Sequence, residues 1–214
     1  MLNIGGIANV TLLPPGAKLA DVRAFDTGPG NCISDHLMRL HDPRGPGFDA
    51  DGALAENGTP IAEVLDAAKK HPFFQARGPK STDGPEMIQL YLDARRKLGR
   101  RKLRLEDELA TAAALCAWAV ARAIRFGPRG RFAGQLIVSG GGIHNRAIMA
   151  ELRRQIDKSA TIHTSEQLGV VSAAKEALAF ALLGAATLDR QPGNVPTATG
   201  ARRGVVLGSI TPRP

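Results

Sequence analysis

Three glycine-rich segments each follow a short apolar stretch that is typical of a β-strand. They lie at residues 3–6 (Asn-Ile-Gly-Gly), 26–31 (Asp-Thr-Gly-Pro-Gly-Asn) and 139–142 (Ser-Gly-Gly-Gly). Glycine permits positive φ and lets backbone N–H groups approach an anion with no side chain in the way. The second and third segments also lead into predicted helices, whose N-termini favour phosphate. One such loop indicates only a tight turn, whereas three in one chain favour a nucleotide site.

The order of predicted elements indicates an α/β fold. Strands are expected at residues 2–13, 22–25, 135–138 and 161–163, the first two joined as a hairpin by a Pro-Pro-Gly turn. Helices are expected at residues 33–40, 61–70, 87–97, 105–126, 145–157 and 172–188, with loops at 42–58 and 76–86. The helix at 105–126 has an apolar stripe: Leu109, Ala112, Ala113, Cys116, Val120, Ala123 and Ile124. Alternating strands and helices predict a mainly parallel sheet covered by helices.

The basic charge of the chain is local. Seven of its 28 Lys and Arg residues lie between Arg95 and Arg104, which leaves 21 against 20 acidic residues. No aromatic side chains interrupt this run, so we expect a solvated helix end and loop rather than a nucleic-acid site. Two distant cysteines indicate a reducing compartment, and five histidines without paired spacing make a zinc site unexpected. Without a signal peptide or an apolar stretch of ~20 residues, we expect a cytoplasmic protein.

Asp26 is the best catalytic candidate, because it ends a predicted strand and enters the second glycine loop. It suits a general base near a phosphate, a Mg²⁺ ligand or a cap of the next helix, and these alternatives stay open. Glu176 enters an otherwise apolar helix, as a functional group or as its exposed edge. The loop at residues 80–82 (Lys-Ser-Thr) either contacts phosphate or is solvated. Neither a P-loop nor a GxGxxG fingerprint is present, which disfavours P-loop NTPases and dehydrogenases.

The ordered motifs resemble those of the anhydro-N-acetylmuramic acid kinases. They are LNIGGIANVTLL, FDTGPGN, FDADGALAENG, GPKST, LIVSGGGIHN, KEALAFALLG, PGNVPTATGA and LGSI, and they extend over nearly the whole chain. DTGPGN and PKST together are specific to that family, whereas VSGGG is shared across the acetate and sugar kinase, Hsp70 and actin superfamily. The resemblance implies one actin-like (ribonuclease H-like) ATPase domain over residues 1–214, the second half of a two-domain kinase, with a loop and helical insertion at 42–105.

The resemblance also implies an activity. The family uses ATP and Mg²⁺ to phosphorylate 1,6-anhydro-N-acetylmuramic acid while water opens the anhydro ring, giving N-acetylmuramic acid 6-phosphate in cell-wall sugar recycling. It implies Asp26 as the base and as a sugar contact, and Glu176 as a second sugar contact. Together with the glycine loops it implies nucleotide contacts by Gly5, Gly6, Gly28, Gly30, Asn31, Gly140, Gly141, Gly142 and Asn145. No residue is assigned to the metal, which accompanies ATP.

The chain departs from the family pattern in two places. The family's N-terminal domain, with its GTSxDG-type phosphate loop, has no counterpart, so we expect impaired activity, exposed apolar surface, and a missing N-terminal half or a homodimer as partner. The family's PKSTGRE is PKSTDGPE here, with Pro85 where the Arg would fall. Alternative readings are a non-catalytic fragment with weak or no ATP binding, another acetate or sugar kinase-like phosphotransferase, or, least supported, a nucleic-acid-binding module at residues 95–104.

Overall fold

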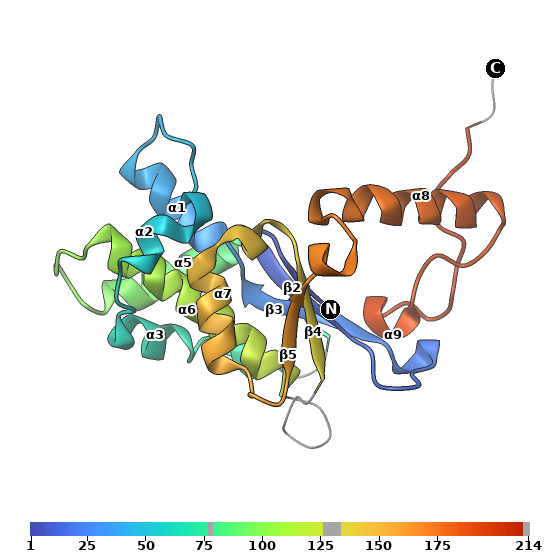
Figure 1. The fold of residues 1–214 in the computed structure, drawn as a ribbon, viewed down its shortest axis with the longest axis horizontal. Helices are drawn as coiled ribbons and strands as arrows, with labels where there is room; N and C mark the ends of the chain where they lie inside the picture. The colour runs from blue at the N-terminus through green and yellow to red at the C-terminus, as the bar shows by residue number, and fades with distance from the viewer. Residues whose placement is uncertain (77–78, 126–133, 212–214) are drawn as a thin grey trace.

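A computed structural model describes residues 1–76, 79–125 and 134–211 of the chain. Its centre is a five-stranded sheet in the order β3-β2-β1-β4-β5 (Figure 1). The strands are β1 (Leu2–Ile4), β2 (Ile7–Leu12), β3 (Arg23–Pro29), β4 (Gln135–Ser139) and β5 (Thr161–Thr164). β2 pairs antiparallel with both β1 and β3, whereas β4 pairs parallel with both β1 and β5.

The expectation of a mainly parallel sheet is wrong for the first three strands. The single strand expected at residues 2–13 is two antiparallel strands, β1 and β2, that reverse at Gly5 and Gly6. The hairpin of β2 and β3 is confirmed, but β3 continues through Asp26 to Pro29. Parallel neighbours need a crossover of a dozen or more residues, so only the strands separated by helices are parallel.

Nine α-helices are described, and they lie on both sides of the sheet. On one side gather α1 to α7, and on the other lie α8 and α9 (Figure 1). Their bounds are α1 Cys32–His41, α2 Ala53–Glu56, α3 Ala62–Ala68, α4 Pro72–Gln75, α5 Gly84–Arg96, α6 Leu105–Ile124, α7 Arg146–Gln155, α8 Lys175–Leu188 and α9 Pro196–Thr199. Short 3-10 turns occur at Leu19–Asp21, Ala50–Gly52, Gly141–His144, Glu166–Leu168 and Ser172–Ala174.

Two helices in the first half differ from expectation for local reasons. The loop expected at residues 42–58 contains α2, whose Leu54 and Ala55 N–H groups both donate to the Asp49 carboxylate at 3.0 Å. α5 begins earlier than expected because Asp83 caps it, accepting from the Glu86 N–H at 2.9 Å. Pro85 then occupies the first turn, where its missing N–H costs nothing.

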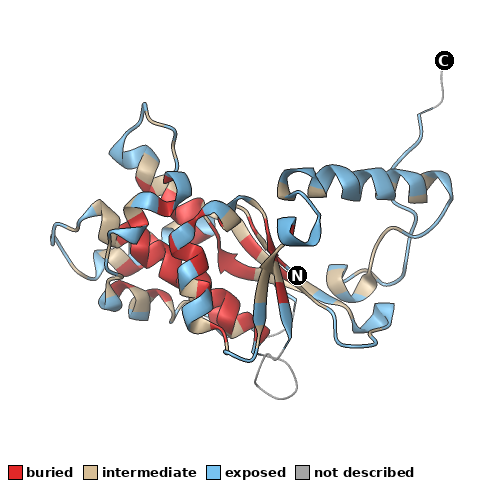
Figure 2. Ribbon diagram, in the orientation of Figure 1, coloured by how far each residue is buried: buried red, intermediate tan, exposed pale blue. Residues whose placement is uncertain are grey.

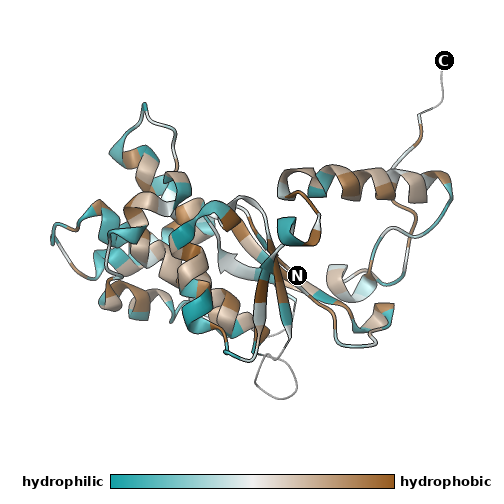
Figure 3. Ribbon diagram, in the orientation of Figure 1, coloured by the Kyte–Doolittle hydropathy of each residue, from teal (hydrophilic) through white to brown (hydrophobic). Residues whose placement is uncertain are grey.

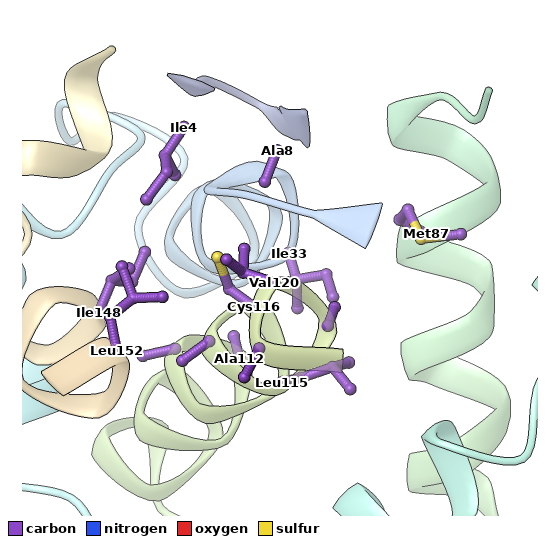
Figure 4. Close-up of a cluster of buried hydrophobic side chains, with 14 of the residues drawn as sticks. Ile4, Ala8, Ile33, Met87, Ala112, Leu115, Cys116, Val120, Ile148 and Leu152 are labelled. Carbon is purple, nitrogen blue, oxygen red and sulfur yellow. The ribbon is translucent and has the colours of Figure 1, made fainter. Parts of the chain in front are cut away.

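The core surrounds α6. All seven residues of its predicted apolar stripe are buried, but so are alanines off that stripe, among them Ala110, Ala114 and Ala117. Small alanine side chains allow close packing on several sides at once, against the sheet, α1, α2, α3 and α7. Figure 4 shows Cys116 and Val120 of α6 facing this cluster. Burial raises the pKa of the Cys116 thiol to about 12, so it behaves as a small apolar side chain.

The second glycine loop closes on the first through backbone hydrogen bonds. The N–H of Gly30 donates to the Gly6 carbonyl at 2.9 Å, and the N–H of Asn31 donates to the Gly5 carbonyl at 2.9 Å. A Cβ at Gly30 would lie 2.3 Å from the Gly5 carbonyl oxygen. Glycine at position 30 is therefore required by the close approach of two backbones.

The third glycine loop packs on the end of β1. Gly140 has φ +86°, and a Cβ there would lie 2.5 Å from the Ile4 carbonyl oxygen. A Cβ at Gly142 would meet the Ile4 side chain at 2.3 Å. The three loops that the sequence places far apart thus meet around residues 4–6.

The substitution Gly30→Ala should destabilise the chain, because its Cβ clashes with a carbonyl that cannot move without breaking the loop. We expect a loss of about 1–3 kcal/mol in the free energy of unfolding, measured by urea denaturation. Gly141→Ala is the matched control, since its Cβ would meet no atom within 4 Å. Equal stability of the two variants would contradict this packing.

Candidate active site

Asp26 lies at an irregularity in the sheet. Asn9 of β2 pairs with Asp26, and the preceding Ala8 pairs with Gly28, so Thr27 is an extra residue in β3. The Thr27 hydroxyl donates to the Ala8 carbonyl at 3.1 Å. Such bulges redirect side chains and are frequent beside active sites.

The Asp26 carboxylate is held through one oxygen. The Ser81 hydroxyl and the Thr82 N–H both donate to Oδ2 at 2.9 Å, and the Asp26 N–H donates to the Lys80 carbonyl at 2.9 Å. Within the described ranges, Oδ1 accepts no hydrogen bond. The carboxylate is therefore fixed in orientation and keeps one oxygen for a ligand or a proton.

The loop at residues 80–82 thus orients the Asp26 carboxylate through hydrogen bonds. Its first residue, Lys80, donates from Nζ to the Phe73 carbonyl at 2.7 Å, and its ammonium group lies over the Phe73 ring. Burial and the nearby Arg122 lower the pKa of Lys80. The reading of Asp26 as a helix cap is wrong, because the cap position of α1 belongs to Asn31.

A row of polar side chains crosses the sheet from Asp26. Asp26 pairs with Asn9, Asn9 pairs with Asn3, and Asn3 pairs with Ser139 of β4. Neighbours along the strands, such as Ala8 and Val10, are buried on the α1–α7 side. Because side chains alternate along a strand, the row faces the other side, where α8 and α9 lie (Figure 1).

Lys175, at the start of α8, fastens that helix to the row. Its Nζ donates to Asn3 Oδ1 and to Ser139 Oγ, the latter at 2.7 Å. Burial lowers the pKa of Lys175, and the adjacent Glu176 opposes this shift. A second tie runs from the Gly140 N–H to the Ser172 hydroxyl at 2.7 Å. The third glycine loop and the first turns of α8 therefore form one unit.

The predicted nucleotide contacts are not equivalent in the structure. The N–H groups of Gly5, Gly30 and Asn31 donate to protein carbonyls. Gly28 packs against α4, where an added Cβ would lie 2.8 Å from the Phe74 ring. In the first two loops these backbone groups serve packing.

The third loop has two available donors. In the portion of the chain that the structure describes, the N–H groups of Gly141 and Gly142 meet no acceptor. Asn145 follows as the buried cap of α7, where its Oδ1 accepts from the Ile148 N–H at 3.0 Å. Asn145 therefore shapes this loop through its cap.

Glu176 is exposed and points from α8, one residue after the lysine tie. Among the described residues, no hydrogen bond or ion pair joins it to Asp26. The structure therefore places Glu176 in the first turn of α8 and Asp26 in β3, without a direct bond between them.

Four members of the arrangement were not predicted as site residues: Asn3, Asn9, Ser139 and Lys175. Asn3 and Asn9 carry a signal, since each is polar within an apolar strand, and the alternation of side chains puts both on one face. The bonds made by Ser139 and Lys175 join segments 36 residues apart, which no local pattern reveals.

The described residues hold neither a metal-binding cluster nor a helix that could span a membrane. Across residues 1–76, 79–125 and 134–211, no group of three or more His, Cys, Asp and Glu side chains is placed to hold a metal ion. Nor does any helix in these ranges have the length and apolar character needed to cross a membrane.

The substitution Lys175→Met should release α8 from the sheet, because it removes the two side-chain bonds from Nζ. Hydrogen exchange in residues 175–188 should accelerate about tenfold or more, as expected for charged hydrogen bonds worth about 1.5–3 kcal/mol. Exchange in α6 should not change. Lys158→Met, at an exposed lysine, is the control; unchanged exchange in α8 of the Lys175 variant would contradict the tie.

Comparisons with known proteins show the family to which the chain belongs. A family model described as Anhydro-N-acetylmuramic acid kinase matches residues 1–213. Proteins of that name from Salinibacter ruber, Rhodococcus erythropolis and Caldanaerobacter subterraneus subsp. tengcongensis are 41%, 40% and 37% identical to this chain. The matches cover 98–99% of this chain but 53% of each relative, so the chain spans about half the length of the curated relatives it matches. By sequence and over nearly its full length, the chain belongs to the anhydro-N-acetylmuramic acid kinase family.

Proposed function

We infer that the chain supplies the catalytic carboxylate and one nucleotide loop of an ATP-dependent sugar kinase acting on 1,6-anhydro-N-acetylmuramic acid. The observation that carries this is the geometry of Asp26, held through Oδ2 by Ser81 and Thr82 with Oδ1 left for a ligand. The family match and the names of the relatives support the substrate class. The product is N-acetylmuramic acid 6-phosphate, in cytoplasmic recycling of cell-wall sugar.

In the proposed reaction, Asp26 Oδ1 accepts a proton from water while the water oxygen bonds to the anomeric carbon. The bond from that carbon to the bridging O6 breaks, and its electron pair stays on O6. O6 then bonds to the γ-phosphorus of ATP, and the bond from that phosphorus to the β,γ-bridging oxygen breaks to release ADP. A positioned carboxylate supplies the base, and phosphoryl transfer needs chiefly alignment and charge neutralisation.

The third glycine loop is the part of the chain that suits the phosphates of ATP. The Gly141 and Gly142 N–H groups provide donors, and Lys175 places a cation at the adjoining ends of β1 and β4. Mg²⁺ would arrive with ATP and neutralise phosphate charge. Glu176, next to Lys175, is the proposed second contact to the sugar.

The fold supports this assignment at the level of architecture. A sheet in the order β3-β2-β1-β4-β5, with the first three strands antiparallel, fits an actin-like (ribonuclease H-like) ATPase domain over residues 1–214. The stretch at 42–105 separates α1 from α6 and is assigned as an insertion. It contains α2 to α5, of which α2 and α3 pack against α6, and its residues Ser81 and Thr82 reach the polar row at Asp26.

The remaining half of the kinase is the proposed partner, and α8 is its proposed docking surface. α8 has no buried residue, although it is strongly apolar (Figures 2 and 3). Phe180 is 72% exposed and Leu182 is 63% exposed. Each of the relatives named above has about as many residues again that this chain does not match, enough to cover such a surface.

Replacing Asp26 by Asn should abolish turnover and leave nucleotide binding intact. We expect ADP release, measured for the chain mixed with the unmatched half of the Salinibacter ruber relative, to fall by about 10²–10⁴-fold, as for loss of a general base. ATP·Mg²⁺ binding by calorimetry should be unchanged, and Asp66→Asn, at an exposed carboxylate of α3, is the control. Full turnover by Asp26→Asn would overturn the role of the base, and no ATP·Mg²⁺ binding by the unaltered chain would favour the non-catalytic alternative.

The isolated chain should self-associate through α8. Static light scattering should show a mass that rises with concentration, because water leaves an exposed apolar helix only by association. The double substitution Phe180→Ser and Leu182→Ser should give a monomer without loss of stability, since both side chains are exposed. Leu40→Ser, at an exposed leucine of α1, is the control and should not prevent association; monomeric behaviour of the unaltered chain would contradict the proposed surface.

A further inference from the structure

At one end of the polar row, the side chains are hydrogen-bonded within the protein. At the other end, some of their donors and acceptors have no partner among the described residues. On β1 and β4, Asn3 and Ser139 are both bonded to Lys175. On β2 and β3, among the described residues, the Asp26 carboxylate accepts hydrogen bonds through Oδ2 alone, and the Asn9 carboxamide makes none. The open end therefore consists of one carboxylate oxygen and one carboxamide.

The sheet brings these two groups together. Asn9 is the cross-strand partner of Asp26, and partners in an antiparallel pair have Cβ atoms about 5 Å apart. The bulge at Thr27 fixes this register, because the next pair along is Ala8 with Gly28. Both side chains face away from the α1–α7 layer.

The position of Asn9 between two buried residues of β2 favours a ligand-binding role for its side chain. Asparagine is disfavoured within strands, and both neighbours of Asn9 along β2, Ala8 and Val10, are fully buried. Asn3, the equivalent residue of β1, is bonded within the protein, so its polarity has a structural cause. Asn9 has no such cause in the described chain.

The chemistry of the pair favours an uncharged polar part of a ligand, such as a hydroxyl or an acetamido group. A carboxamide both donates and accepts, as a sugar hydroxyl or acetamido group requires, and the adjacent carboxylate oxygen accepts from the water of the proposed reaction. A phosphate at the same place would meet the negative charge of Asp26. Phosphates instead suit the opposite end of the row, where Lys175 and the Gly140–Gly142 loop lie.

We propose that Asn9 is a substrate-binding residue whose carboxamide hydrogen-bonds a hydroxyl of the sugar beside Asp26. The proposal rests on the proposed function, because it assigns a further contact within the same site. It also orders the row: sugar over β2 and β3, and nucleotide phosphates over β1 and β4.

The test follows the side-chain NH₂ signals of Asn9 by nuclear magnetic resonance while 1,6-anhydro-N-acetylmuramic acid is added to the chain. We expect these signals to shift, and Asn9→Ala to weaken sugar binding about tenfold while ATP·Mg²⁺ binding stays within about twofold, as for loss of one hydrogen bond to the ligand. Thr11→Ala is the matched control, since Thr11 lies on the same face of β2, opposite Ala24 rather than Asp26. Thermal unfolding of both variants checks that the sheet is intact.

The outcomes separate this inference from the proposed function. Sugar binding that is equal in Asn9→Ala and the unaltered chain overturns the role of Asn9 and leaves the function standing. A chain that binds ATP·Mg²⁺ but no sugar also overturns the role of Asn9, because the open end of the row is then no sugar site in this chain. Binding of neither ligand overturns the proposed function itself.

Discussion

Two backbone hydrogen bonds, from Gly30 and Asn31 to the carbonyls of Gly6 and Gly5, close the second glycine loop on the first. They exist only because no side chain at position 30 separates the two loops. The same short turn at residues 5–6 makes β1 and β2 antiparallel, and the end of β1 receives the third glycine loop at Gly140. The glycines of the three loops therefore serve first to let the loops pack closely on one another. The candidate site lies on the strands that these loops connect.

The two faces of the sheet have different roles. One face carries small and branched apolar side chains that pack on α6, as Figure 4 shows, and supplies the stability of the chain. The other carries the polar row from Asp26 to Ser139, to which Lys175 anchors α8. Because the row is anchored on a rigid sheet, its side chains are held in position before any ligand arrives, as catalysis by positioning requires.

Local patterns predicted the long helices and picked out Asp26, because periodicity and strand-end position depend on nearby residues. They missed the reversal at Gly5 and Gly6, since a two-residue turn between apolar residues looks like one continuous strand. They also missed Lys175, which lies 172 residues from its partner Asn3. The role of the loop at residues 80–82 was unpredictable for the same reason, because Ser81 meets Asp26 only through the fold.

In the proposed site, sugar and nucleotide meet over the polar row, with Asp26 Oδ1 as the base. The most direct measurement is a crystal structure of the chain, completed by the other half of a family kinase, with the anhydro sugar and a non-hydrolysable ATP analogue. We expect a water within hydrogen-bond reach of Asp26 Oδ1, about 2.6–3.2 Å, facing the anomeric carbon, and the γ-phosphate at the Gly140–Gly142 loop. A sugar bound elsewhere, or an Asp26 that contacts neither water nor sugar, would contradict it.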